Sequence, residues 1–137
     1  MKNKFLKDTI YVVETNIDDM SPVVYETVFE KLYKAGALEV FLTPVQMKKT
    51  RPGILLTALI PKNKLEKIAE AVLRETTSFG IRYYEAKRLK LIRESKKQNG
   101  IKINKGYIGR ELIKVSQEYA DCLRAASKKR SPLKDIL

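Results

Sequence analysis

Residues 9–22 read TIYVVETNIDDMSP, and this stretch predicts a buried strand that runs through an acidic turn into a helix. Its first half is rich in β-branched and aromatic side chains, which are typical of a buried strand. Ser21 then offers a hydroxyl that can cap free backbone amides, and Pro22 is well tolerated at a first helical position. We expect the helix to end at Gly36, because glycine suits the left-handed residue that closes a helix.

The rest of the chain alternates between further predicted strands and helices. Pro44 predicts an edge position or a bulge for its strand, whereas the almost wholly apolar segment 54–60 is typical of a central strand. Asn63 and Glu66 have the spacing of a capping box at a helix start. The predicted elements are strands at 38–47 and 54–60, a helix from Asn63 to near Thr77, strand character from Ile81 to Lys97, a turn at Asn99-Gly100, strands at 101–103 and 112–115, a helix from Tyr119 to about Arg130, and a short helix after Ser131-Pro132.

The order β-α-β-β-α-β over residues 9 to about 90 predicts an α+β fold of the ferredoxin-like kind. In this split βαβ arrangement, an antiparallel sheet carries two helices on one face. A β-hairpin extension and a helix are expected over residues 91–137. Since 137 residues is about the size of one domain, we expect residues 1–137 to form a single domain with this core and this extension.

The net charge of +12, from 28 Lys and Arg against 16 Asp and Glu, indicates a surface that attracts polyanions. A nucleotide, RNA or lipid headgroups would suit such a surface. A chain that simply favours solvated charge would have the same composition, and only clustering of the charges separates these explanations. No apolar run is typical of a signal peptide or long enough for a membrane span, so a cytoplasmic protein is expected.

The chain has no histidine and a single cysteine, Cys122, which excludes an internal disulfide. Histidine is the usual ligand for nickel, zinc and copper, so a soft-metal site within this chain is disfavoured. Conventional Ser-His-Asp, Cys-His and CxxC mechanisms are disfavoured for the same reason. Hard cations such as magnesium or manganese, bound by carboxylates and by phosphates, remain suitable.

Two charged clusters lie where predicted strands meet turns. Glu14, Asp18 and Asp19 surround the end of the first strand; such acids suit a helix dipole, and they also suit a magnesium ion held against phosphate. The second cluster, in the turn before Pro52-Gly53, suits either a solvated turn or a grip on a triphosphate. Its cations are Lys48, Lys49 and Arg51, and Arg82 is expected near a sheet end.

Several short strings occur in a fixed order along this chain: ETNIDDM at 14–20, AGALEVF at 35–41, QMKK at 46–49 with RPG at 51–53, and RETT at 74–77 with Gly80 and Arg82. Each string is weak alone. Their order and spacing together closely resemble the nickel-insertion proteins of nickel-pincer cofactor synthesis, and the resemblance continues through Glu118-Tyr119 and Asp121-Cys122. It covers nearly the whole chain.

The resemblance implies a CTP-dependent cyclometallase, a nickel chelatase of the lyase class. Such an enzyme inserts Ni²⁺, its substrate, into pyridinium-3,5-bisthiocarboxylic acid mononucleotide. This chain would be the carboxy-terminal domain that holds CTP with Mn²⁺ or Mg²⁺, inactive without a preceding histidine-rich, nickel-binding portion. The charges of this chain suit that role, and our hypothesis places Asp18 with Asp19 or Glu14 at the metal, Lys48, Lys49, Arg51 and Arg82 at the phosphates, and Thr76 and Thr77 as hydroxyl contacts.

Two other classes of function fit a basic ferredoxin-like domain. An RNA-binding module would stack bases on sheet aromatics such as Tyr83, Tyr84 and Tyr107, although closely spaced aromatics with intervening glycine are missing. A nucleic-acid partner is therefore not expected. A structural or regulatory oligomerisation domain is the second alternative, because small ferredoxin-like units often pair their sheets. We expect a homo-oligomer, which is compatible with nucleotide binding.

Overall fold

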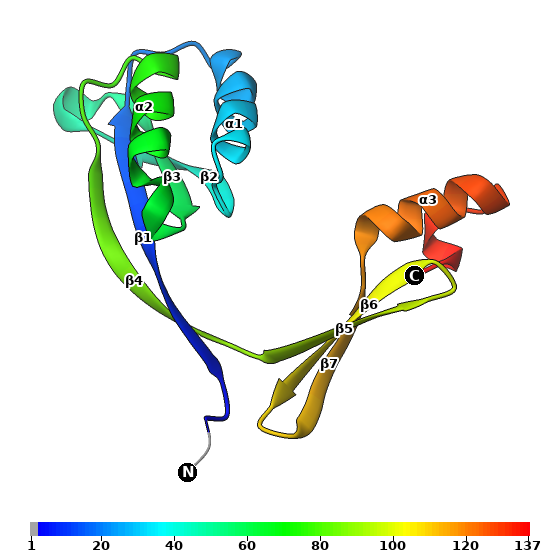
Figure 1. Ribbon diagram of the computed structural model, residues 1–137. Helices are drawn as coiled ribbons and strands as arrows, with labels where there is room; N and C mark the ends of the chain where they lie inside the picture. Colours follow the sequence, from blue (N-terminus) through cyan, green and yellow to red (C-terminus); the bar gives the residue numbers. More distant parts are fainter. Residues whose placement is uncertain (1–2) are drawn as a thin grey trace. The chain divides into compact units, whose positions relative to one another are not determined.

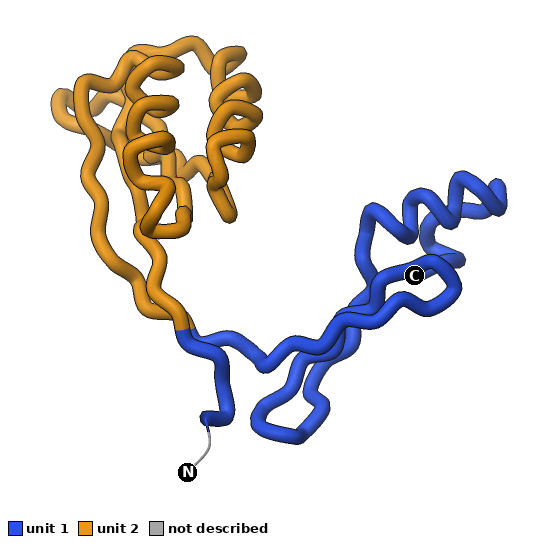
Figure 2. The backbone as a smooth tube through the Cα atoms, in the orientation of Figure 1, with its two compact units in different colours: residues 1–7, 89–137 blue, residues 8–88 orange. Residues whose placement is uncertain are grey.

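The structure, a computed structural model, describes residues 3–137 and divides the chain into two compact units (Figure 2). Unit 2 contains residues 8–88, and unit 1 contains residues 1–7 and 89–137. The first and fourth strands each have a part in both units. The boundary between the units thus falls close to the expected boundary between the ferredoxin-like core and its extension.

Unit 2 contains one four-stranded sheet whose strand order is β2-β3-β1-β4. β3 runs antiparallel to both of its neighbours. The predicted central strand and the predicted edge strand with Pro44 are therefore confirmed as β3 and β2. The elements are β1 (Leu6–Ile17), α1 (Val24–Lys34), β2 (Glu39–Gln46), β3 (Pro52–Ile60), α2 (Leu65–Glu75) and β4 (Arg82–Lys90), with short 3₁₀ turns η1 (Lys48–Thr50) and η2 (Lys62–Lys64).

Both long helices of unit 2 cover the same face of this sheet (Figure 1), which confirms the ferredoxin-like prediction. Leu32 of α1 and Ile68 of α2 are fully buried there. β1 alternates its side chains, so that Val13 and Ile17 belong to the core between the sheet and the helices while Glu14 and Asn16 face the other side. No described helix has the length and apolar character needed to cross a membrane.

Two predicted helix caps are wrong. α1 begins at Val24 rather than at Pro22, and the backbone carbonyl of Ser21, not its hydroxyl, accepts the Val24 N–H at 3.1 Å. Asn63 lies in η2, and α2 begins at Leu65 without a side-chain cap. In both places a tight turn presents backbone carbonyls to the first amides, so no side-chain acceptor is needed. The prediction for Gly36 is confirmed by its φ of 109°.

Unit 1 contains a second antiparallel sheet, of order β5-β6-β7, together with α3. The predicted turn at Asn99-Gly100 is confirmed, with φ values of 54° and 78°. The strand expected from Ile81 to Lys97 is instead interrupted at Leu91, and a third strand joins the predicted hairpin. The elements are β5 (Ile92–Gln98), β6 (Ile101–Ile108), β7 (Glu111–Gln117), α3 (Tyr119–Lys129) and a terminal 3₁₀ turn, η3 (Leu133–Asp135).

Candidate functional site

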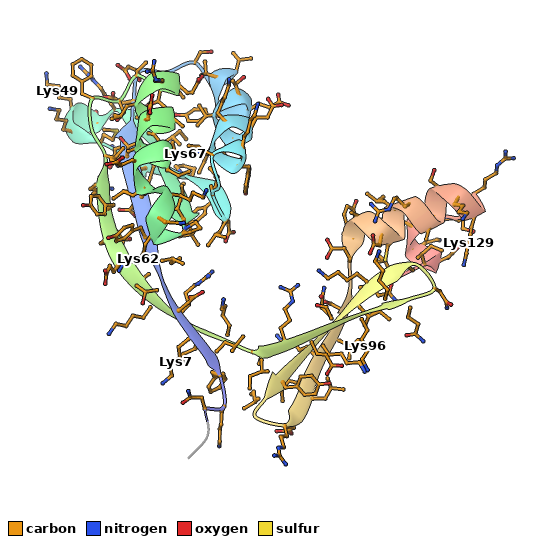
Figure 3. The ribbon with its side chains drawn as sticks, viewed as in Figure 1. Lys7, Lys49, Lys62, Lys67, Lys96 and Lys129 are labelled. Atoms are coloured by element: carbon orange, nitrogen blue, oxygen red, sulfur yellow. The ribbon has the colours of Figure 1, made fainter. Side chains whose placement is uncertain are left out.

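Three segments of unit 2 meet where β1 ends: the end of β1 itself, the basic turn at 48–51, and the loop between α2 and β4. The Arg51 guanidinium lies 3.5 Å from the Asp18 carboxylate, and the Thr77 hydroxyl donates to the Asp19 carboxylate at 2.5 Å. Since these two aspartates are consecutive, the turn and the loop both reach the same point of the chain. Figure 3 shows Lys49 at this end of unit 2. We call this region the charged end.

The cations of the basic turn remain accessible to a ligand. Lys48 and Lys49 are exposed, and the Arg51 side chain is 56% exposed. An exposed ion pair such as Arg51–Asp18 contributes at most about 1 kcal/mol, so it gives way readily to a stronger anion. Lys49 has a φ of 59° and Thr50 one of 58°, which bends the turn sharply, and both residues are exposed.

The loop that follows α2 is held by its own hydroxyls. Thr76 donates to the Val72 carbonyl at 2.7 Å and accepts the Ser78 N–H at 3.2 Å. Buried Thr15 of β1 bonds to Ser78 and donates to the Gly80 carbonyl at 3.1 Å. The Thr76 hydroxyl therefore caps the helix, whereas Thr77 contacts Asp19 at the charged end. Sequence reasoning did not single out Thr15, although a threonine among the inward apolar residues of a buried strand needs a polar partner.

Glu14 and Arg82 form a separate network on the sheet face that α1 and α2 leave uncovered. Arg82 donates through Nε to Glu14 at 2.9 Å and through Nη1 to Asn16 at 2.6 Å. The Tyr84 hydroxyl donates to the other Glu14 oxygen at 3.2 Å. Burial and the neighbouring Glu14 carboxylate raise the pKa of Tyr84. These contacts bring Arg82 to Glu14 rather than to Asp18 or Asp19, and they reveal Asn16 and Tyr84 as further members of this network.

The three predicted metal ligands therefore have different partners. Asp18 pairs with Arg51, Asp19 with Thr77 and Glu14 with Arg82. Within residues 3–137, no three acidic, cysteine or histidine side chains lie close enough together to hold a metal ion. Carboxylate oxygens suit Mn²⁺ or Mg²⁺, but an ion held here needs most of its ligands from water and from a bound phosphate. Cys122 lies in unit 1, buried beside Gln117.

A small hollow of about 360 Å³ lies beside Asp18. Apolar side chains dominate it, and Asp18 supplies its only charge. This hollow was not predicted, because its walls come from β1, α1, β2 and β3, which are distant in the sequence. Its lining residues are Ile17, Asp18, Met20, Pro22, Tyr25, Leu42, Pro52, Gly53 and Ile54.

Tyr25 is expected to report on the carboxylates of the charged end. Burial raises the pKa of its phenol, and the Asp19 charge raises it further. Because the neutral phenol is favoured in the folded state, this contribution to stability is present below pH 10 and is lost as the pH rises above that value. Replacing Asp19 with asparagine should lower the pKa of Tyr25 but leave it above 10. Ultraviolet titration at high pH, with Tyr25→Phe assigning the signal, measures this; an unchanged or increased pKa would contradict it.

These features define a ferredoxin-like α+β domain with a charged end in which carboxylates, exposed cations and an apolar hollow adjoin. The model of one protein family, described as nickel insertion protein, matches residues 1–137. The chain belongs to the nickel insertion protein family.

Curated relatives in this family are similar over most of this chain. A pyridinium-3,5-bisthiocarboxylic acid mononucleotide nickel insertion protein from Clostridium acetobutylicum is 43% identical over 87% of this chain and 29% of its own length. The protein of the same name from Acetivibrio thermocellus is 42% identical over 96% of this chain and 33% of its own length. The chain thus spans about a third of the length of these relatives.

Two solved structures share the fold. The C-terminal domain of a cyclometallase involved in the synthesis of the NPN cofactor of lactate racemase, in its apo form, matches with a TM-score of 0.84 and 30% identity, over 96% of this chain and 93% of that domain. A protein from Methanopyrus kandleri AV19 matches with a TM-score of 0.69 at 19% identity, over 95% of this chain and 85% of that one. The second match concerns the fold alone.

Proposed function

We propose that this chain is the CTP-binding, carboxy-terminal domain of a nickel chelatase, and that the charged end of unit 2 holds CTP together with Mn²⁺ or Mg²⁺. The observation that carries this proposal is the meeting of the basic turn, the acidic end of β1 and the Thr77 loop at one point. Cations and carboxylates in contact suit a triphosphate whose charge is shared between protein cations and a bound metal ion. The likeness to a cyclometallase C-terminal domain supports it.

Lys48, Lys49 and Arg51 neutralise the phosphates in this proposal. The long Arg51–Asp18 contact breaks when a phosphate arrives, which frees Arg51 for a forked contact and Asp18 for the metal ion. Asp19 is a further carboxylate at the charged end and Thr77 adds a hydroxyl, whereas Glu14 would have to leave its pairing with Arg82 to reach the metal ion. Arg82 and Thr76 contribute less directly to nucleotide binding. The Arg82 guanidinium is hydrogen-bonded to Glu14, and the Thr76 hydroxyl donates to the Val72 carbonyl at the end of α2.

The apolar hollow gives the base of the nucleotide a place next to these phosphates. Its volume of about 360 Å³ falls in the range of small-molecule pockets. A flat pyrimidine ring is expected to lie against Tyr25 and Leu42. Asp18 at the rim then lies between the base and the phosphate cations, as one bound nucleotide requires.

The complete reaction belongs to a longer protein in this proposal. The relatives are named for nickel insertion into a pyridinium mononucleotide, and this chain covers only about a third of them. This sequence has no histidine, so Ni²⁺ is expected to be bound by the preceding histidine-rich portion while this domain supplies the nucleotide. We place the protein in the cytoplasm and expect it to act as a homo-oligomer, as part of a lyase-class, CTP-dependent cyclometallase that makes the nickel-pincer nucleotide cofactor.

A nucleotide-binding screen tests the proposal. The chain is titrated calorimetrically with CTP, UTP, ATP and GTP, each with and without Mn²⁺. We expect the metal ion to strengthen binding and CTP to bind most tightly, by about tenfold or more, because a pocket that hydrogen-bonds one base leaves polar groups unpaired with another. Equal affinity for all four nucleotides, or no binding of any, would refute a CTP domain.

A further inference from the structure

The positive charge of this protein is concentrated in unit 1. Unit 1 has 16 Lys and Arg against 5 Asp and Glu, whereas unit 2 has 12 against 11. Nearly all of the net charge of +12 therefore comes from residues 1–7 and 89–137, outside the unit that contains the charged end. Lys96 and Lys129 mark this distribution on β5 and α3 in Figure 3. A surface of uniformly solvated charge would not be divided in this way.

Unit 1 also has its own cavity, of about 820 Å³. Four of its lining residues are cations and none is acidic, so the cavity is electrostatically complementary to an anion. Four others are aliphatic. The lining consists of Lys90, Arg93, Lys105, Lys114, Leu6, Leu91, Ile113, Val115, Asn104, Gly106 and Ser116.

The sheet of unit 1 arranges the polar lining in two neighbouring rows. Gly106 pairs with Arg93 on one side and with Lys114 on the other, so the two cations flank a position without a side chain. Directly paired residues on neighbouring strands share a face of the sheet. A β-carbon at Gly106 would lie 2.6 Å from a methyl carbon of Leu91, so any other residue here would shift the Leu91 side chain from its place in the cavity wall.

The second row places a buried amide next to these cations. Asn104 pairs in register with Ser95 and Ser116, two residues along from the first row. Asn104 is only 9% exposed as a residue, and its side-chain oxygen accepts the Ser95 hydroxyl at 2.7 Å. The amide nitrogen of Asn104 donates to no protein group within residues 3–137, and since no buried polar side-chain atom there lacks a partner, this nitrogen keeps some exposure. It is a fixed donor that lines the cavity and suits an anionic oxygen.

From this arrangement we infer that the unit 1 cavity is a second binding site, for a small organic anion of mononucleotide size. Its phosphate or carboxylate lies on Arg93, Lys114 and the Asn104 amide, and its ring lies against Leu91. If the proposed function holds, the ligand is the pyridinium mononucleotide that receives nickel, and this identification rests on that proposal. The chain then has separate sites for the activating nucleotide in unit 2 and for the mononucleotide in unit 1.

A small molecule fits these observations better than RNA does. Sequence-tolerant RNA binding uses exposed aromatic side chains on which bases stack. The lining of this cavity contains no aromatic residue, and Tyr107 of β6 instead bonds to Glu94. Apolar walls around a few convergent polar groups are the usual design of a small-ligand site.

The test compares two double variants that remove the same charge from unit 1. Arg93→Ala with Lys114→Ala alters the cavity, whereas Arg110→Ala with Lys97→Ala removes one exposed arginine and one exposed lysine outside its lining. The full chain is titrated with nicotinate mononucleotide, CMP, inorganic phosphate and a 20-nucleotide RNA. We expect nicotinate mononucleotide to bind more tightly than CMP or phosphate. The cavity variant should weaken it at least tenfold and the control less than twofold.

Manganese-dependent CTP binding is measured on the same variants, so that failure of the two proposals can be told apart. It should be unchanged in the cavity variant if unit 2 holds CTP. The second site is refuted if wild type does not bind nicotinate mononucleotide, if both double variants weaken it equally, or if phosphate alone binds as tightly. Tighter binding of RNA that depends on Arg93 and Lys114 would assign the surface to nucleic acid, and tighter binding of CMP would overturn the assignment to a pyridinium ligand.

Discussion

Replacement of Leu32 by alanine is expected to lower the free energy of unfolding of unit 2 by about 2–5 kcal/mol. Leu32 has 0% exposure and belongs to the core between α1, α2 and the sheet. The change removes buried methyl groups, and the cavity that remains cannot collapse because α1 is held against both β2 and α2. Since a small domain is stable by only about 5–15 kcal/mol, much of its stability would be lost.

Amide hydrogen exchange measures this effect unit by unit, which matters because the two compact units need not unfold together. Protection should fall throughout unit 2 in the Leu32→Ala protein. Leu73→Ala on α2 is the matched control, because that leucine is 40% exposed and alanine is a good helix former. A loss of protection no greater than in the Leu73 variant would show that the helices do not depend on this core.

The ferredoxin-like unit could be predicted because its signals are local. Alternating apolar residues in β1, the apolar run of β3 and the helical spacing in α1 and α2 each specify an element, and their order specifies the sheet. The caps failed at Ser21 and Asn63, because a side chain that can cap a helix does so only where a turn has not already provided backbone acceptors. The break between β4 and β5 at Leu91 was not predicted for another reason. It lies close to the boundary between the two units, and that boundary depends on contacts across the whole chain.

The charged end shows which part of a binding site a sequence can reveal. The two aspartates that follow β1 and the cations of the basic turn were identifiable from residue type and position, and the structure brings Asp18 to Arg51 and Asp19 to Thr77. The pairing of Arg82 with Glu14 could not be predicted. It depends on which strands are neighbours in the sheet and on which face of the sheet each side chain lies.

The two cavities were beyond sequence reasoning, because each is lined by several strands. The net charge alone also did not distinguish a surface that binds polyanions from charge that is simply solvated. Its concentration in unit 1 became visible only when the boundary between the units was known.

Replacement of Asp18 by alanine is expected to weaken CTP binding with Mn²⁺ but not without it. Without the metal ion, the variant loses a negative charge facing the phosphates and frees Arg51 from its 3.5 Å contact, so CTP should bind as tightly as to wild type or more tightly. With Mn²⁺, it loses a proposed metal ligand, and the affinity should fall about tenfold or more, the value of one charged contact.

Lys49→Ala should weaken CTP binding under both conditions, because a phosphate cation acts whether or not a metal ion is present. Combining it with Asp18→Ala should lower the affinity about 100-fold with Mn²⁺ if each residue removes about tenfold. Glu66→Ala with Lys67→Ala, one exposed acid and one exposed base on α2, is the matched control and should have no effect.

Isothermal titration of these variants separates the role of a metal ligand from that of a phosphate cation. If the Asp18 variant lost affinity equally with and without Mn²⁺, Asp18 would be a structural partner of Arg51 rather than a metal ligand. If the double variant bound CTP like wild type, the charged end would not be the nucleotide site.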